Sequence, residues 1–366
     1  MNEHELAILH RFCLDAEPAS CTPYGCGHIN RTYLVATAGG RCYILQKINH
    51  HTFRDVAGLM ENIELVTEHL RRKSPDPRSV LTLIRTKDGK SYLEADDGYW
   101  RVFRFVEDSI CLQQPESDAD FYESAVGFGT FQQLLSDFPA EKLHETIPNF
   151  HNTPDRYRAF HETLTRDPMH RAAQVQPEIE FALARQAEMA ALQNALDAGE
   201  LPLRVTHNDT KLNNVLFDAK TRRALCIIDL DTVMPGSALY DYGDSIRFGA
   251  ATAAEDEREL DKMEMSLERF RVFTRGYVRA CPGLTQKELE LLPLGAKVMT
   301  MECGVRFLTD HIDGDNYFSI HREGQNLDRA RTQFKLVADM ERKWDKMKEI
   351  VNEEVQNAKE NGSCCI

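Results

Sequence analysis

The character of this 366-residue chain changes near residue 107. Before that point, short runs rich in β-branched and aromatic residues alternate with turn residues, which predicts strands joined by hairpins. After it, most apolar residues recur at intervals of three and four, which predicts helices. We therefore predict an α+β fold, with a small β-rich lobe over residues 1–106 and a larger, mainly helical lobe over residues 107–366.

The first lobe contains five strand-favouring runs and one amphipathic segment. The runs are, in chain order, residues 32–35, 42–45, 80–84, 92–93 and 100–106. The first two flank Gly39 and Gly40 and predict one hairpin, while the next two flank the turn residues 87–90 and predict another. Between residues 55 and 71 the apolar positions step by 3, 4, 3 and 4, so we expect a helix there.

The second lobe has helical periodicity in most of its length. We expect helices over residues 121–135, 178–196, 263–277 and 286–308, and a long final helix with an apolar stripe from Phe334 to Val351. A short island of strands and loops, residues 203–231, interrupts this series.

That island carries the strongest functional signal. His207, Asp209 and Asn214 form an H-x-D-x4-N pattern, and Asp229 follows at the end of an apolar run. Phosphoryl transfer needs such a set, because one carboxylate accepts the acceptor's proton while an amide oxygen and a second carboxylate hold Mg²⁺ against phosphates. The alternative, a turn whose polar residues only cap backbone groups, is less favoured because apolar strands flank the loop.

Two further segments of the first lobe suit a phosphate site. Gly25 and Gly27 precede a predicted strand, where backbone amides can approach phosphates, although such a pair more often makes only a tight hairpin. Lys47 ends the next strand and is placed to neutralise phosphates and to pair with Glu64 of the predicted helix. The alternative is an edge-strand lysine beside a solvated helix face.

Charge and cysteine usage exclude several classes of protein. Lys and Arg total 44 against 58 Asp and Glu, a net charge of −14, which argues against a general nucleic-acid binder. No run approaches 18 apolar residues, and the first nine residues lack a basic signal region, so neither a membrane span nor secretion is expected. The 10 cysteines form no C-x-x-C pair, which favours free thiols and a cytoplasmic location.

The ordered set of motifs resembles the aminoglycoside phosphotransferase and choline kinase-like family, which has a protein-kinase-like fold. The resemblance is carried by Gly27 with Asn30, residues 43–46, Glu64, residues 207–214, Ile228 with Asp229, and residues 241–244. It implies a small-molecule kinase that uses ATP and Mg²⁺, with Asp209 as base and Asn214 and Asp229 as metal ligands. The sequence departs at Gln46, where the family usually has Lys or Arg. Lys47 lies one residue later, so it faces the opposite side of the strand unless a bulge turns it inward.

The resemblance also implies contacts for each substrate. The implied nucleotide contacts are Gly25, Gly27, Asn30, Gln46, Lys47, Glu64, Phe105 and Val106, and the implied acceptor contacts are Asp209, His28, Arg306, Asp310 and Tyr317. Asp241 matches an acid that braces the catalytic loop, and Asp231 is a candidate second acid beside the metal. Arg306 and Asp310 are four residues apart on a predicted helix, so a surface ion pair is the alternative to a pocket role.

Three functions remain open at this point. The runs 206–214 and 301–308 are similar to family members that phosphorylate the C1 hydroxyl of an N-acetylhexosamine, which makes a sugar 1-kinase the favoured hypothesis. A kinase for an aminoglycoside or a choline-like amino alcohol is the second, and it fits the net charge of −14 loosely. A kinase-like module without activity is the third, but Asp209, Asn214 and Asp229 are all present.

Overall fold

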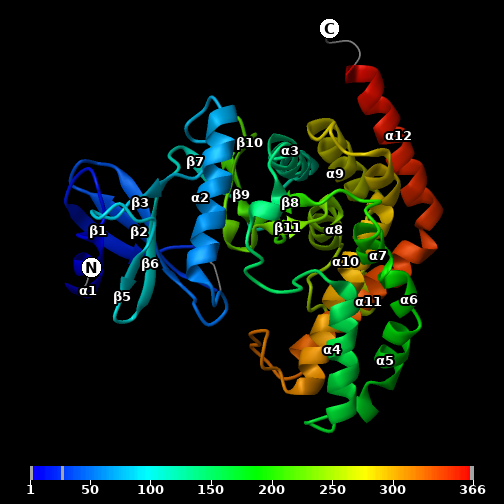
Figure 1. Ribbon diagram of the computed structural model, residues 1–366. Helices are drawn as coiled ribbons and strands as arrows, with labels where there is room; N and C mark the ends of the chain where they lie inside the picture. Colours follow the sequence, from blue (N-terminus) through cyan, green and yellow to red (C-terminus); the bar gives the residue numbers. More distant parts are fainter. Residues whose placement is uncertain (1–2, 26–28, 363–366) are drawn as a thin grey trace.

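The computed structural model describes residues 3–25 and 29–362 and has the two parts that the sequence predicts (Figure 1). The elements of the N-terminal lobe are α1 (Glu3–Leu9), β1 (Pro18–Pro23), β2 (Arg31–Thr37), β3 (Cys42–Ile48), α2 (Val56–Lys73), β4 (Leu83–Ile84), β5 (Leu93–Ala95) and β6 (Gly98–Arg104). Its antiparallel sheet has the order β1-β2-β3-β6-β4, with β5 also paired to β6. The predicted β2–β3 hairpin and the predicted helix, α2, are confirmed.

The second predicted hairpin is wrong. β4 and β5 do not pair with each other; β4 pairs with β6 at Val102 and Phe103, and β5 pairs with the same strand between Gly98 and Trp100. The opposite edge of β6 is taken by β3, so the two short strands share the one edge that is left. The sequence signals of the strands were right, but their partner lies further along the chain.

The C-terminal lobe is mainly helical. Its elements are β7 (Ser109–Cys111), α3 (Asp118–Leu134), α4 (Thr153–Arg166), α5 (Gln176–Leu183), α6 (Gln186–Met189), α7 (Ala191–Asp197), β8 (Arg204–Thr206), β9 (Val215–Asp218), β10 (Ala224–Ile227), β11 (Met234–Gly236), α8 (Ala238–Gly249), α9 (Leu267–Ala280), α10 (Gln286–Asp313), α11 (Gln325–Arg342) and α12 (Trp344–Gly362). α3, α9 and α10 confirm three predicted helices. The segment predicted as one helix over 178–196 is three short helices instead.

Two other differences from the predicted helices have clear causes. The long final helix is broken at Lys343, yet α11 and α12 flank that single residue, so the apolar spacing runs across the break unchanged. α8 was not predicted; nearly all of its side chains are buried, including the polar residues Asp241 and Asp244, so it lacks the solvent-facing side of a surface helix.

α2 connects the two lobes through a shared hydrophobic core. Leu59 and Ile63 of α2 belong to the same buried cluster as Phe131 of α3 and Val205 of β8. In Figure 1, α2 stands between the N-terminal sheet and the C-terminal helices. The buried amide of Asn62 strengthens the contact, since its Nδ2 donates to the carbonyl oxygens of His144 at 2.8 Å and Val233 at 3.0 Å. The sheet is therefore held at a set position relative to β8 and the loop that follows it.

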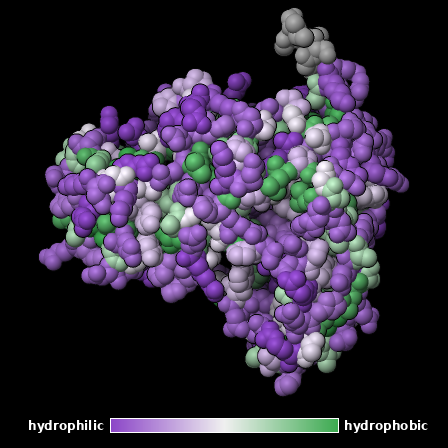
Figure 2. Space-filling view, viewed as in Figure 1, coloured by the Kyte–Doolittle hydropathy of each residue, from purple (hydrophilic) through white to green (hydrophobic). Residues whose placement is uncertain are grey.

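The molecular surface is mostly polar. Figure 2 shows a face that is predominantly hydrophilic, hollowed beneath the N-terminal lobe beside the C-terminal helices. Among the residues that the structure describes, no helix combines the length and the apolar character needed to cross a bilayer.

Candidate active site

The candidate catalytic residues lie on the loop after β8. β8 pairs with β11, and β9 pairs with β10, so residues 207–214 connect two short antiparallel ladders. Asn208 has a φ of 65°, a left-handed conformation that Asn tolerates better than most residues. The next residue, Asp209, has a carboxylate that is 31% exposed. The loop geometry thus presents one carboxylate to solvent from an otherwise buried segment.

Both carboxylate oxygens of Asp209 have a donor. Lys211 Nζ lies 2.8 Å from Oδ1, and Asn214 Nδ2 lies 3.1 Å from Oδ2. The same Asn214 amide nitrogen donates to the Asp209 carbonyl at 2.8 Å, so its Oδ1 is left for another ligand. Burial opposes ionisation, but Lys211 lowers the pKa of Asp209 below its ordinary value. Lys211 was not in the predicted set, although its place two residues after Asp209 was a usable signal.

Asp241 braces this loop, as the resemblance implies. Its buried carboxylate accepts hydrogen bonds from the backbone amides of His207 at 2.9 Å and Asn208 at 2.8 Å. A third comes from Gln132 Nε2 at 2.9 Å. Thr210 Oγ1 also donates to the Asp241 carbonyl at 2.6 Å. Because one buried anion holds successive loop amides, the position of Asp209 depends on α8.

Asp229 lies close to Asp209 and Asp231, whose negative charges oppose its ionisation. It has a left-handed φ of 59°, and its side chain is exposed. Although the residue is accessible to solvent, nearby protein atoms weaken the hydration of its carboxylate. Together with the negative charges of Asp231 and Asp209, this raises the pKa of Asp229 to about 7. Among residues 3–25 and 29–362, no three His, Cys, Asp or Glu side chains are placed to hold an ion by themselves. Asp229 and the free Asn214 oxygen suit a hard cation that takes its remaining ligands from phosphates and water.

The N-terminal lobe contributes Asn30 and Gly25. Asn30 Nδ2 donates to Asp231 Oδ2 at 2.6 Å, and its Oδ1 accepts from the Asn49 amide at 3.0 Å. Gly25 has a φ of 79°, and a Cβ there would meet nothing within 4 Å. Among the described residues, nothing blocks the approach of a ligand to Gly25. The predicted contacts Gly27 and His28 lie outside the described residues.

The predicted pair between Lys47 and Glu64 is not formed. Lys47 Nζ lies 2.6 Å from Asp97, and Glu64 Oε2 lies 2.9 Å from Arg85 Nη2. Successive residues of a strand point to opposite faces, so Lys47 lies on the face away from Gln46. No bulge interrupts the β2–β3 register to turn it inward.

Arg101, which the sequence reasoning missed, is the cation beside Gln46. The two are direct cross-strand partners in the β3–β6 ladder, and Arg101 Nε donates to Gln46 Oε1 at 2.9 Å. Arg101 is 1% exposed, and its Nη1 lies 2.6 Å from Asp231 Oδ1. A usable signal existed, because an arginine between Trp100 and Val102 in an apolar strand is a buried charge that needs a partner.

An apolar surface lies where the lobes join. The Tyr24 ring meets the Phe105 ring edge-on, with 6.1 Å between centroids. The Phe105 amide donates to the Cys42 carbonyl at 3.1 Å, and Val106 is buried. Tyr24 and Phe105 therefore form an apolar surface where the two lobes join, and a planar aromatic ligand could pack against it.

Arg306 on α10 is surrounded by aromatic rings. Its guanidinium carbon lies 5.2, 5.7 and 5.5 Å from the ring centroids of Phe150, Tyr317 and Phe318. Its Nη2 is 3.4 Å from the hydroxyl of Tyr317, a residue that is 64% exposed. Arg156 lies near it and donates to the Phe150 carbonyl at 2.6 Å. Within the described part of the chain, no carboxylate is at ion-pair distance from Arg306 or Arg156.

Asp310 does not pair with Arg306 and is not free to meet an acceptor. Its buried carboxylate accepts from the backbone amides of Asn316, Tyr317 and Phe318 at 2.8–2.9 Å, and from Asn326 Nδ2 at 2.9 Å. Both the predicted surface ion pair and the predicted acceptor contact are therefore corrected. Asp310 shapes the loop that carries Tyr317.

A buried chain of contacts links α10 to the catalytic loop. Glu302, one turn before Arg306, has Oε1 2.7 Å from His151 Nδ1. The other ring nitrogen of His151 is 3.2 Å from the Asn208 carbonyl. Arg306 thus lies on a helix that is tied to the residue before Asp209.

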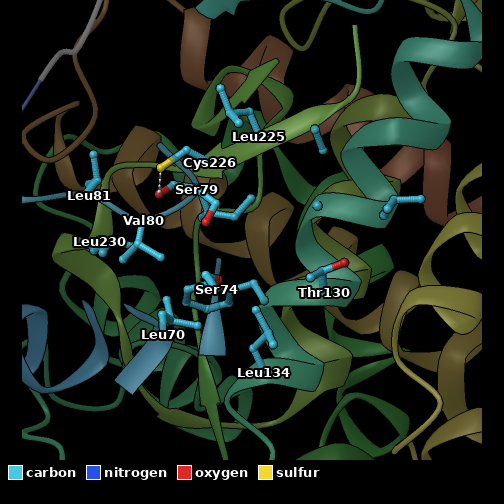
Figure 3. Close-up of a pocket in the computed structure, with 15 residues that line it drawn as sticks. Leu70, Ser74, Ser79, Val80, Leu81, Thr130, Leu134, Leu225, Cys226 and Leu230 are labelled. Atoms are coloured by element: carbon cyan, nitrogen blue, oxygen red, sulfur yellow. Dashed lines mark hydrogen bonds between the residues drawn. The ribbon is translucent and has the colours of Figure 1, made fainter. Parts of the chain in front are cut away.

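A separate apolar pocket lies between α2, α3 and β10 (Figure 3). Leu70, Val80, Leu134 and Cys226 are among the side chains that line it, and none of the polar site residues does. Burial raises the pKa of the Cys226 thiol to about 12, so this cysteine stays protonated and unreactive.

Comparison with known proteins identifies the family. The model of the phosphotransferase enzyme family (APH) matches residues 20–272, more than half of the chain. The chain belongs to this phosphotransferase family. Solved structures with a similar fold include an aminoglycoside phosphotransferase from Alicyclobacillus acidocaldarius, with 11% identity, a TM-score of 0.57 and 96% of each chain covered.

Two other solved structures resemble this phosphotransferase. A microcompartment-associated aminopropanol kinase has 16% identity and a TM-score of 0.56, with 94% of this chain and 98% of the other covered. Amicoumacin kinase, solved with AMP-PNP and Ca²⁺, has 14% identity and a TM-score of 0.58, with 92% and 93% covered. At these identities the likeness shows the fold alone.

Proposed function

We propose that this phosphotransferase is an ATP- and Mg²⁺-dependent N-acetylhexosamine 1-kinase. It would transfer the γ-phosphoryl group of ATP to the C1 hydroxyl of the sugar, giving an α-sugar 1-phosphate and ADP. The runs 206–214 and 301–308 support this acceptor through their resemblance, and the contacts around Asp209 support the chemistry.

The nucleotide would lie between the lobes. Its adenine would pack against Tyr24, Phe105 and Val106, and its phosphates would extend past Gly25. Asn214 and Asp229 are the residues that would hold Mg²⁺, which neutralises phosphate charge when it is bound. The amicoumacin kinase structure, with its nucleotide analogue and divalent ion, is consistent with this arrangement.

Asp209 would act as the base. The O–H bond of the C1 hydroxyl breaks and its proton passes to Asp209, while the oxygen forms a bond to the γ-phosphorus and ADP leaves. Lys211 and Asn214 keep the carboxylate ionised and oriented for this step. An anomeric hydroxyl is more acidic than an ordinary alcohol, so a base with a low pKa is sufficient and positioning supplies most of the rate.

The positive charge around Arg306 is the observation that favours a neutral sugar over an amine-bearing acceptor. Among the described residues, Arg306 and Arg156 have no carboxylate at ion-pair distance; Glu302, which is bound to His151, interacts with both only from further away, and aromatic rings surround Arg306. An aminoglycoside or a choline-like amino alcohol would bring ammonium groups against these guanidiniums, which is unfavourable. A neutral sugar instead offers hydroxyl and N-acetyl oxygens as acceptors and an apolar ring face to the aromatic side chains.

An acceptor screen tests the proposal. The protein is incubated with ATP and Mg²⁺ and with N-acetylglucosamine, N-acetylgalactosamine, glucose, choline, aminopropanol or an aminoglycoside, with Asp209→Asn as the blank. We expect ADP release with the N-acetylated sugars, loss of their reducing end, and an α-linked phosphate in the ³¹P spectrum. Turnover of an amine-bearing acceptor with both N-acetylhexosamines inert would overturn the proposal.

A further inference from the structure

The cation beside the expected phosphate position comes from an unexpected strand. On β3 the inward-facing residue is the neutral Gln46, and the adjacent Lys47 faces away and is paired with Asp97. Gln46 Nε2 donates to Thr32 Oγ1 at 3.1 Å, and its Oε1 accepts from Arg101 at 2.9 Å. The positive charge that β3 lacks is therefore present on β6, directly across the ladder.

Arg101 is held in place but is not fully satisfied. Its Nη1 contacts Asp231 Oδ1 at 2.6 Å, yet the alignment does not make a hydrogen bond, and that oxygen has no other partner. Nη1 also lies 3.9 Å from Met60 Sδ. Within the described residues, Arg101 Nη2 has no acceptor. A guanidinium N–H group without an acceptor can donate to one that a ligand brings.

Asp231 places Arg101 at the phosphate side of the cleft. It lies two residues after Asp229, the proposed metal ligand, and its Oδ2 accepts from Asn30 Nδ2 at 2.6 Å. Asp231 thus contacts both Arg101 and Asn30, a residue that we expect to contact the nucleotide. Lys211, by contrast, is bound to Asp209, where the γ-phosphoryl would be transferred.

We propose that Arg101, oriented by Gln46, supplies the positive charge that meets the nucleotide phosphates in this chain, and that Asp231 is its counterion in the free protein. A planar guanidinium suits this role, since its paired N–H groups bind phosphate oxygens in two-point contacts that a lysine cannot make. Gln46 occupies Nε and leaves both Nη groups for this purpose. The inference rests on the proposed function only in taking a nucleotide as phosphoryl donor.

The test measures nucleotide binding without any acceptor. Arg101→Met removes the charge and keeps most of the stem, and calorimetry compares adenosine, ADP and ATP. We expect ADP and ATP to bind about tenfold more weakly or worse, as for a lost charge-assisted hydrogen bond, while adenosine changes little. Arg104→Met is the matched control, because Arg104 is exposed on the same strand and should leave all three affinities unchanged.

A second variant tests whether a cation on β3 can replace the guanidinium of Arg101. In the Arg101→Met background, Gln46→Lys returns a cation to β3, and we expect part of the ADP and ATP affinity to return. A purely structural Arg101–Asp231 pair predicts the opposite pattern: a lower melting temperature, equal losses for adenosine and ATP, and no rescue. That pattern would overturn the proposal.

The wild-type protein gives a check that does not depend on any variant folding. In a crystal structure with ADP, Arg101 should lie within hydrogen-bond distance of a phosphate oxygen. A guanidinium still bound to Asp231 and remote from both phosphates would refute the proposal. None of these measurements uses an acceptor. A failed acceptor screen would therefore overturn the sugar 1-kinase assignment but not the role proposed for Arg101.

Discussion

His151 and Glu302 form a buried pair, with 2.7 Å between Nδ1 and Oε1, although 151 residues separate them in the chain. The second oxygen of Glu302 accepts from Thr153 Oγ1 at 2.7 Å, and the second nitrogen of His151 faces the Asn208 carbonyl. Both ring nitrogens of His151 therefore lie within hydrogen-bond distance of an oxygen. The pair joins α10 and α4 to the catalytic loop.

Glu302→Gln should lower stability in a pH-dependent way. Burial opposes ionisation of Glu302, but His151 holds its pKa below the ordinary value of 4.5. A depressed pKa stabilises the fold above the unfolded value, and that stabilisation is lost as pH falls through the folded value. At neutral pH we expect a loss of about 2 kcal/mol or more in the free energy of unfolding.

Thermal melting from pH 7 to pH 3.5 checks this prediction. The gap in melting temperature between wild type and Glu302→Gln should narrow as pH falls below about 4.5. Glu290→Gln, an exposed change on the same helix, is the control and should show no such gap. A constant gap across the range would mean that the charge of Glu302 contributes nothing.

Asp209→Asn should abolish phosphoryl transfer while the nucleotide still binds. The amide cannot accept the acceptor's proton, so we expect kcat to fall about 100-fold or more. Single-turnover kinetics measure the rate, and calorimetry with ATP measures binding. A variant that keeps more than about a tenth of wild-type kcat would remove Asp209 from the role of base.

Activity should depend on a divalent metal held through Asn214 and Asp229. Excess chelator should stop turnover, and Mg²⁺ or Mn²⁺ should restore it, because both residues offer the oxygen ligands that hard cations prefer. Asn214→Ala should raise the metal concentration needed for half activity. Asn213→Ala is the matched control, since its side chain lies near Gln113 instead of Asp209. Full turnover in chelator would contradict the assignment.

Arg306→Ala should impair use of the acceptor without unfolding the protein. Loss of a charged hydrogen bond to the sugar should reduce kcat/KM for the acceptor by about 2 kcal/mol or more, with the KM for ATP unchanged. Arg279→Ala, an exposed change on α9, is the control for a general effect of losing an arginine. A variant that melts much earlier but has normal acceptor kinetics would show that Arg306 is structural.

Asp310→Asn should behave differently from Arg306→Ala. The asparagine loses one of two oxygens that together accept from the amides of Asn316, Tyr317 and Phe318. We expect both a lower melting temperature and a higher acceptor KM, because the loop that carries Tyr317 loosens. Unchanged melting with a raised KM would instead indicate direct contact between Asp310 and the acceptor.

The candidate catalytic loop is visible in the sequence because its signals are local. The order of Asp209, Asn214 and Asp229 and the apolar strands around them are visible in a short stretch of sequence, and the structure brings these residues together. The period of α2 was equally clear. The predicted ion pair between Arg306 and Asp310 is not formed. Helical spacing shows that the two residues share a face, but it does not show that the following loop folds back and donates its amides to Asp310.

The sequence by itself determined the two-part α+β layout, the catalytic loop and the departure at Gln46, since each depends on residues close together in the chain. Only the tertiary structure decided which cation lies beside Gln46. Strand alternation sends Lys47 to the far face, but the register that sets Arg101 opposite Gln46 depends on pairing between β3 and β6. The pairing of strands far apart in the chain depends on tertiary packing, which local sequence patterns do not reveal.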